Sequence, residues 1–148
     1  GVKIYDDYAH NPGKIRSCIE GARSAFPSER ILVIFQPHRY SRLETMYNEF
    51  MQSFEAADEV FVLPVYAAGE TSTRDYSPAR VASDIQNASQ VPASMYAVDV
   101  LKDRLSHQQL PTVLITIGAG DVWRLSQEWK EFLHGPETQK KPPLKPKT

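Results

Sequence analysis

Two short stretches of the sequence hold residues that could bind a charged or hydroxylated ligand. The first, YDDYAHNP over residues 5–12, places Asp6 and Asp7 side by side, with Tyr8 and His10 close behind. A carboxylate beside a strand suits a ribose, because the vicinal hydroxyls of the sugar donate hydrogen bonds to it. Aspartate is also common in solvated turns at strand ends. Two acids beside a tyrosine and a histidine favour a functional role over a plain turn.

The second stretch, PHRYSR over residues 37–42, carries two arginines three positions apart. Arg39 and Arg42 fall at the start of an expected helix, where backbone N–H groups and the helix dipole attract an anion. Because an arginine fork grips a carboxylate or phosphate through two hydrogen bonds, the pair predicts an anion site. The alternative is a solvated first helical turn, although cations at that end oppose the dipole.

Other candidates carry weaker signals. His10 alone, and His38 directly after Pro37, are more often hydrogen-bonded structural histidines than catalytic groups. The GAGD stretch at 118–121 has two glycines of a dinucleotide motif, but Trp123 stands where the third belongs, so a tight strand-to-helix turn is expected. The sequence contains no G-x-x-x-x-G-K-[ST] loop, no zinc-ligand spacing and no nucleophile elbow. We therefore expect binding groups for anions and hydroxyls, and no metal site.

Apolar runs between these stretches predict buried β-strands. The runs are VKIY (2–5), RILVIFQ (30–36), EVFVLPV (59–65) and TVLITIG (112–118), with a weaker fifth, SMYAV (94–98). An uninterrupted apolar run suits a strand that is covered on both faces, as in a parallel sheet. In such a sheet ligands bind beyond the carboxyl ends of the strands, which is where the acid pair, PHRYSR, YAAGETSTRDY (66–76) and GAGD all fall.

The segments between the strands repeat apolar residues at the helical period. The first helix is expected to start with Asn11 as N-cap and Pro12 at its first position. The expected core-facing residues are Ile15, Cys18, Ile19, Ala22 and Phe26; Leu43, Met46, Tyr47, Phe50, Met51 and Phe54; Val81, Ala82 and Ile85 after Ser77–Pro78; Val100, Leu101 and Leu105; and Val122, Leu125, Trp129, Phe132 and Leu133. The alternation predicts a Rossmann-like three-layer α/β sandwich, with a mostly parallel sheet of about five or six strands flanked by helices. It leaves the strand order open.

Composition excludes several classes of protein. The 148 residues include 17 Lys and Arg against 18 Asp and Glu, and the two signs are interspersed, so no nucleic-acid partner is expected. No apolar run could span a bilayer and no signal peptide begins the chain, which predicts a cytoplasmic location without membrane insertion. The single cysteine, Cys18, is expected to be a small core residue in a reducing compartment.

The two ends of the chain differ in character. Gly1 stands directly before an apolar run, as it would in a piece cut just before a strand, and processing or a tag remnant would give the same start. Residues 135–148, GPETQKKPPLKPKT, hold four prolines and four lysines and almost nothing apolar, which predicts a disordered tail after a folded domain over residues 1–134.

Four motifs together point to a known family. YDDYAHNP, FQPHRYSR, VYAAGE and GAGD occur in this order between residues 2 and about 133, and they resemble the C-terminal domain of the Mur ligases. DDYAHNP alone is similar to the wider set of Mur and folylpolyglutamate-type ligases, whereas FQPHRYSR resembles the alanine-adding branch. The branch that recycles murein tripeptide is the nearest alternative. Where relatives commonly have two consecutive histidines before the proline, this chain has His10 and then Asn11.

The resemblance implies an ATP-dependent ligase of three domains, with this chain as the third and by itself inactive. It implies the joining of L-alanine to UDP-N-acetylmuramate through an acyl phosphate in peptidoglycan biosynthesis. ATP and Mg²⁺ would be bound mainly by the central domain and the UDP-sugar by the N-terminal one, so both domains are partners. By resemblance, Asp7, or else Asp6, reaches the ATP ribose.

The same resemblance assigns the acceptor site. Tyr8, His10, Arg39 and Arg42 would line it, and His10, Arg39 and Arg42 would act in catalysis. A different class of protein, a non-catalytic α/β module that binds an anionic small molecule, is the alternative. Such a module would bind its ligand through the arginines without help from other domains. Acceptance of glycine, serine or a peptide in place of alanine stays open, as does the oligomeric state.

Overall fold

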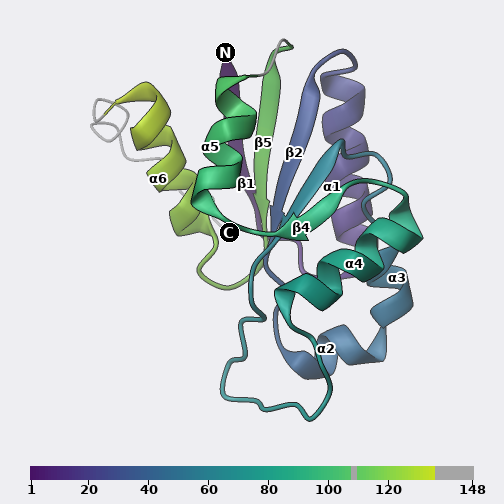
Figure 1. Ribbon diagram of the computed structural model, residues 1–148. Coiled ribbons are helices and arrows are strands. Elements are labelled where there is room, and N and C mark those ends of the chain that lie inside the picture. The colour runs from purple at the N-terminus through teal and green to yellow at the C-terminus, as the bar shows by residue number, and fades with distance from the viewer. Residues whose placement is uncertain (108–109, 136–148) are drawn as a thin grey trace.

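Five parallel strands form the central sheet of the computed structural model, which describes residues 1–107 and 110–135 (Figure 1). The strands are β1 (Val2–Asp7), β2 (Arg30–Phe35), β3 (Glu59–Val62), β4 (Ala93–Met95) and β5 (Thr112–Ile117). Their order in the sheet is β1-β5-β2-β3-β4, and every neighbouring pair runs parallel. The last strand in the chain therefore lies between the first two.

Helices cover both faces of the sheet, which confirms the expected three-layer α/β architecture. The helices are α1 (Pro12–Ala25), α2 (Tyr40–Thr45), α3 (Tyr47–Met51), α4 (Pro78–Ser89), α5 (Val98–Ser106) and α6 (Trp123–His134). The first four contribute to one apolar cluster, and α5 and α6 to a second on the other side. In β2, Val33 belongs to the first cluster, while Leu32 and Ile34 belong to the second. This strand reads as an unbroken apolar run because both of its faces are buried.

Two helices begin as the sequence predicts. The Asn11 side chain accepts a hydrogen bond from the Lys14 backbone N–H at 2.9 Å, and Pro12 follows at the first position of α1. Ser77 caps α4 in the same way, by accepting from the Arg80 N–H at 3.3 Å. Each cap supplies a partner for a backbone donor that the helix leaves unsatisfied.

Several expectations about the core and element bounds are wrong. The stripe from Leu43 to Phe54 predicts one helix, but α2 and α3 are separate and meet at Met46. Phe132 is 60% exposed and Val100 is also exposed, although both were expected in the core. The reason for Phe132 is that α6 packs beside β1 and β5 at one margin of the sheet, so only its inward face is covered. The predicted tail lies outside the described residues except for Gly135.

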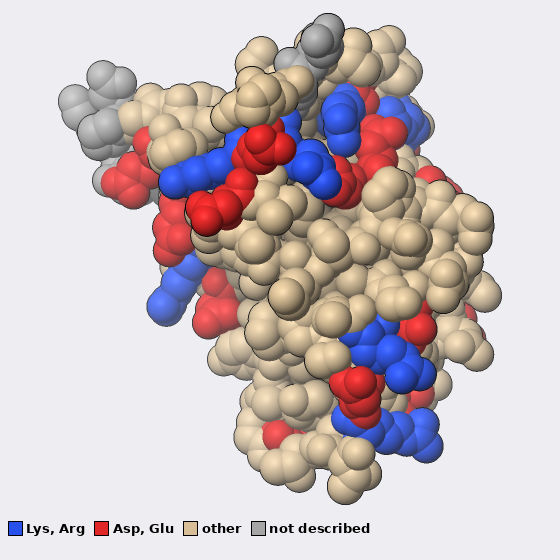
Figure 2. Space-filling model, in the orientation of Figure 1, with Lys and Arg blue, Asp and Glu red and all other residues tan. Residues whose placement is uncertain are grey.

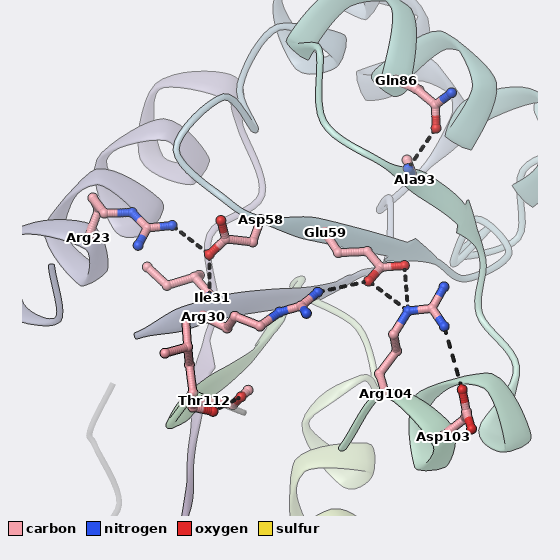
Figure 3. A network of polar contacts seen from close by, with 11 residues as sticks. Arg23, Arg30, Ile31, Asp58, Glu59, Gln86, Ala93, Asp103, Arg104 and Thr112 are labelled. Carbon is pink, nitrogen blue, oxygen red and sulfur yellow. Dashed lines mark hydrogen bonds and ion pairs between the residues drawn. The ribbon is translucent and has the colours of Figure 1, made fainter. Parts of the chain in front are cut away.

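The amino edge of the sheet is held by carboxylates bound to arginines (Figure 3). The Arg104 Nε–H donates to both oxygens of Glu59, at 2.9 and 3.2 Å, and Arg30 donates to the same carboxylate at 3.4 Å. Beside them Arg23 donates to Asp58 at 2.7 Å. Glu59 is only 5% exposed, so its charge depends on these partners. The arginines of this edge are therefore committed to structural pairs.

The surface carries both signs of charge. On the face shown in Figure 2, charged side chains lie in two groups with uncharged surface between them, and both groups mix Lys and Arg with Asp and Glu. This face has no continuous basic stripe of the kind that tracks a nucleic-acid backbone. None of the helices within residues 1–107 and 110–135 is long and apolar enough to cross a membrane.

Candidate functional site

The connections that leave β5 and its two neighbours diverge to opposite faces. β1 and β2 lead into α1 and α2 on one face, whereas β5 between them leads into α6 on the other. The three strands end level, because the Gly118 N–H donates to the Asp7 carbonyl at 3.1 Å and the Gln36 N–H to the Ile117 carbonyl at 2.9 Å. In open parallel sheets, ligands bind where the connections part in this manner.

The two acids of the first motif are the last residues of β1 and have different neighbours. Thr116 donates from its hydroxyl to the Asp6 carboxylate at 2.6 Å. Burial raises the pKa of Asp6 above its ordinary value, and the Thr116 bond only partly offsets that effect. The Asp7 carboxylate accepts from the Ala9 backbone N–H at 2.9 Å, so it also shapes the turn into α1. The structural and functional interpretations of the pair are therefore compatible.

Cys18 lies near Asp7 and has no nucleophilic character. Burial, followed by the Asp7 carboxylate, raises the pKa of its thiol to about 12. The thiol therefore stays protonated at neutral pH, and Cys18 packs against the apolar cluster on the α1 face. This agrees with the structural role expected from its position in the helical stripe.

Tyr8 and His10 lie together after β1. Tyr8 is 67% exposed, and its ring meets the His10 ring edge-on with centroids 5.6 Å apart. Nδ1 of His10 lies 3.1 Å from the Tyr8 carbonyl oxygen, which fixes the imidazole at the surface of the loop. Both side chains are placed where a ligand above the strand ends could reach them.

Arg39 and Arg42 differ in their partners from most of the other arginines, although Arg124, which lies over the Trp123 ring, also forms no ion pair among the described residues. Within residues 1–107 and 110–135 neither takes part in an ion pair, whereas Arg16, Arg23, Arg30, Arg74, Arg80 and Arg104 all do. Arg39 directly precedes α2 with a φ of 71°, a left-handed conformation that costs a residue with a side chain of order 1–3 kcal/mol. The carboxyl edge thus presents two guanidinium groups that form no ion pair with a described carboxylate.

His38 belongs to this group, although the sequence favoured a plain structural role for it. Nη1 of Arg42 lies 2.9 Å from Nδ1 of His38. Arginine has donors only, so Nδ1 accepts and the imidazole is neutral, with its proton on Nε2. Burial and then the charges of Arg42 and Arg39 lower the pKa of His38 below its ordinary value. His38 lies before the first residue of α2, so the helical spacing of side chains does not apply to it, and no local signal pairs it with Arg42.

Glu70 is a second residue that the motif analysis did not single out. Its carboxylate accepts from the Ser41 backbone N–H at 2.9 Å and from the Ser41 hydroxyl at 2.8 Å. These two hydrogen bonds lower the pKa of Glu70. The anion at the start of α2 therefore comes from the protein itself, from the last residue of the VYAAGE motif. Neither Arg39 nor Arg42 forms an ion pair with this carboxylate, although the charge of Arg39 also contributes to the lowered pKa of Glu70.

Gln36 explains the glycines of the GAGD turn. Its Nε2 donates to the Asp121 carboxylate at 2.9 Å, and its buried Oε1 has no hydrogen-bond partner among the described residues. A Cβ on Gly120 would lie 2.7 Å from that oxygen and 2.6 Å from the ring of Tyr66. A Cβ on Gly118 would lie 2.8 Å from the Gln36 carbonyl oxygen. The expected tight turn is confirmed, and close packing is the reason for both glycines.

Of two hollows on the surface, only one is lined by predicted site residues. One of about 260 Å³ at the β1 margin is lined by Asp6 and Asp7, together with Tyr5, Cys18 and Phe26. Another of about 560 Å³ beside α2, α3 and α4 touches none of the predicted site residues. Within the described part of the chain, no three potential ligands among His, Cys, Asp and Glu gather as a metal site would need.

Fold and site define the class: a parallel three-layer α/β domain that carries unpaired arginines, an acid pair and a glycine turn at the carboxyl edge of its sheet. The family model described as "Mur ligase, glutamate ligase domain" matches residues 1–120. The chain belongs to the Mur ligase family.

Relatives within the family share a name. A UDP-N-acetylmuramate–L-alanine ligase of Desulfosudis oleivorans is 38% identical over 133 residues, which cover 86% of this chain and 28% of the relative. One of Desulfitobacterium hafniense is 40% identical over 129 residues, which cover 86% and 29%. The chain thus spans a little over a quarter of the length of these relatives.

Solved structures agree on the fold. The UDP-N-acetylmuramate–alanine ligase of Thermotoga maritima superposes with a TM-score of 0.65 at 28% identity, covering 90% of this chain and 27% of that one. A murein peptide ligase of Psychrobacter arcticus superposes with a TM-score of 0.63 at 18% identity, covering 86% and 26%. The second likeness shows the fold alone.

Proposed function

We propose that this chain is the C-terminal domain of an ATP-dependent ligase that joins L-alanine to UDP-N-acetylmuramate. One observation carries the proposal: the two relatives at 38% and 40% identity over most of the chain are both UDP-N-acetylmuramate–L-alanine ligases. The activity belongs to the longer protein that the length of these relatives implies, and the isolated domain is expected to be inactive.

Arg39 and Arg42 are the groups that would bind the substrates. L-Alanine and the muramoyl group each carry a carboxylate, and two guanidinium groups without carboxylate partners suit such ligands. Both arginines would also offset negative charge that develops when the amine attacks an activated carboxyl group. Because their positions are held by the sheet edge, little reorganisation is needed when the substrates arrive.

Tyr8 and His10 would close the other side of the acceptor site. The exposed Tyr8 ring offers an apolar surface beside the small side chain of alanine. His10 lies close enough to His38 for its charge to affect the pKa of that residue, which supports a shared site. In this position His10 would orient the alanine amine or accept its proton.

ATP would supply the phosphoryl group that converts the muramoyl carboxylate into an acyl phosphate. On this chain, Asp7, or else Asp6, would accept hydrogen bonds from the ribose hydroxyls. Asp7 fits this role because it ends β1 beside the turn into α1, on a hollow of about 260 Å³. The central domain of the longer protein would provide the phosphate-binding loop and the Mg²⁺ ligands. A cytoplasmic location follows from the proposed nucleotide substrates.

The experiment uses the longer protein and follows ADP release with UDP-N-acetylmuramate. L-Alanine, glycine, serine and murein tripeptide are each added in turn, to wild type, Arg42→Ala and a control, Arg74→Ala. Arg74 is mostly exposed and already pairs with Glu44, so its loss should change the rate little. Release that depends on alanine and is lost only in Arg42→Ala would support the proposal.

Release with tripeptide alone would place the protein in the recycling branch. Absence of release with any amino acid, from a folded wild-type protein, would contradict the ligase proposal. In that case, anion binding by the isolated chain would favour a non-catalytic module.

A further inference from the structure

Tyr66 continues the pairing of β2 and β3 beyond their ends. Its backbone N–H donates to the Pro37 carbonyl at 2.8 Å, and its carbonyl accepts from the Arg39 N–H at 2.8 Å. Together these bonds form a parallel bridge between His38 and Tyr66. The backbone of Arg39, which has the unusual φ of 71°, is thus fixed by a residue that lies 27 positions further along the chain.

The Tyr66 side chain makes two further contacts at the site. Its ring lies nearly parallel to the His38 imidazole, with centroids 5.3 Å apart and an interplanar angle of 8°. The same ring packs so closely on Gly120 that a Cβ there would lie 2.6 Å from it. Tyr66 therefore joins the loop after β2 to the turn after β5, across the point where the connections part.

We propose that Tyr66 is a positioning residue for the acceptor site. Its carbonyl holds Arg39, its ring holds His38, and His38 in turn holds Arg42 through the 2.9 Å contact. The role of the arginines in this inference rests on the proposed function. The contacts of Tyr66 do not, because they are features of the structure itself. Without the ring, the His38 imidazole would rotate, and Arg42 would lose the acceptor that orients it.

The ring and the hydroxyl of Tyr66 are separable. The side chain is 38% exposed, and no hydrogen bond of its hydroxyl occurs among the described residues. Tyr66→Phe keeps the stack and removes only the hydroxyl, whereas Tyr66→Leu removes the flat ring that faces the imidazole. The backbone bonds to Pro37 and Arg39 remain possible in both variants. This pair distinguishes positioning through the ring from direct contact of the hydroxyl with a substrate.

The first arm of the test uses this 148-residue chain and no substrate. NMR follows the ring signals of His38 against pH in wild type, Tyr66→Phe and Tyr66→Leu. The charged or titratable groups that act on His38 are Arg42 and Arg39 by α2, His10 after β1 and Glu70 after β3. None of them is altered, so a changed midpoint reports the ring. We expect wild type and Tyr66→Phe to titrate together, and Tyr66→Leu to titrate at higher pH because its imidazole is better solvated.

The second arm measures KM values in the longer protein. Tyr66→Leu is expected to raise KM for L-alanine about tenfold, while KM for ATP stays within about twofold of wild type and Tyr66→Phe behaves as wild type. A general loss of folding would change both KM values and the thermal midpoint, so the split between substrates identifies positioning.

Each outcome decides a separate point. An unchanged His38 midpoint in Tyr66→Leu, or an unchanged KM for alanine in an active enzyme, would overturn the positioning role. Equal loss in Tyr66→Phe would overturn it in favour of a hydroxyl contact. If the wild-type longer protein releases no ADP with alanine, the proposed function fails, and the titration arm alone decides whether Tyr66 positions His38.

Discussion

The guanidinium of Arg42 is bound to a neutral imidazole, with 2.9 Å between its Nη1 and Nδ1 of His38. A carboxylate in the same place would orient the arginine equally well but would cancel its charge. Histidine supplies the orientation and leaves the positive charge for an incoming anion. Arg104, at the opposite edge of the sheet, shows the other arrangement, because it shares the carboxylate of Glu59 with Arg30.

Arg42→Lys tests whether the fork of Arg42 matters beyond its charge. Lysine keeps the charge but is a point donor, and it cannot bind His38 and a carboxylate with the same planar geometry. We expect kcat/KM for L-alanine in the longer protein to fall about tenfold, which corresponds to ~1.4 kcal/mol of transition-state binding. Arg74→Lys is the matched control. Wild-type kinetics in Arg42→Lys would mean that charge alone is sufficient.

We predict that the contact between His38 and Arg42, and the stability it provides, are lost in mild acid. Its pKa in the folded chain is below the ordinary value of 6.5, so the folded state prefers the neutral ring. The corresponding stabilisation is complete above about pH 6.5 and is lost as the pH falls through the lowered pKa. A protonated ring also cannot accept from Arg42.

The measurement for His38 is urea unfolding of the chain between pH 7.5 and pH 5. His38→Gln keeps a hydrogen-bond acceptor but does not titrate, so it should lose less stability than wild type over this range. The same fall in both proteins would assign the acid sensitivity to other groups, such as the carboxylates.

The acid pair can be separated by amide substitution. Both acids line the hollow at the β1 margin, but Asp6 already receives the Thr116 hydroxyl, and burial raises its pKa. In the longer protein, Asp7→Asn is expected to raise KM for ATP about tenfold, because an amide is a weaker acceptor for ribose hydroxyls than a carboxylate. Asp6→Asn should leave KM for ATP nearly unchanged. The reverse order would assign the ribose to Asp6.

Gly120→Ala is expected to destabilise the chain by about 1–3 kcal/mol, because the new methyl group would overlap the Tyr66 ring and Gln36 Oε1. Gly21→Ala is the control. Gly21 lies within α1 with nothing within 4 Å of the added Cβ, so alanine there should stabilise by about 0.5–1 kcal/mol through helix propensity. Denaturant unfolding of both variants gives the comparison. Equal free energies of unfolding in the two variants would show that the turn after β5 accommodates the added methyl group at no cost.

Glu59→Gln tests the arginine network at the amino edge. Removing the buried charge leaves Arg30 and Arg104 without their shared carboxylate, and we expect a loss of about 1–3 kcal/mol on denaturant unfolding. Glu55→Gln breaks the exposed pair with Arg16 and should change stability by less than about 1 kcal/mol. Similar small effects at both positions would mean that water replaces the network.

Local chemistry explains which parts of the fold were predictable. Asn11 and Pro12 define the start of α1 because capping depends on neighbouring residues only. The continuous apolar run of β2 indicates burial on both faces because strand side chains alternate. The position of β5 between β1 and β2 was not predictable, because it depends on packing between segments far apart in the sequence.

The candidate site, like the fold, was only partly predictable from the sequence. Arg39, Arg42, Asp6 and Asp7 stand out by residue type and spacing, and the structure places them at the carboxyl edge of the sheet. The orientation of His38 depends on the ring of Tyr66, which lies 28 residues further along the sequence. A parallel β-bridge beyond the ends of β2 and β3 brings the two residues together. No local pattern reports such a contact. Phe132 shows the reverse error, because a helical stripe does not reveal how much of it the sheet covers.

The brevity of β4 limits how the domain can aggregate. This strand ends one side of the sheet, has only three residues and follows Pro92 directly. An open strand edge is a template on which another chain can add, and very short edge strands reduce that hazard. Three residues offer too few free backbone groups to hold a foreign strand in register. The short β4 edge is therefore a poor template for a strand of another chain at this margin of the sheet.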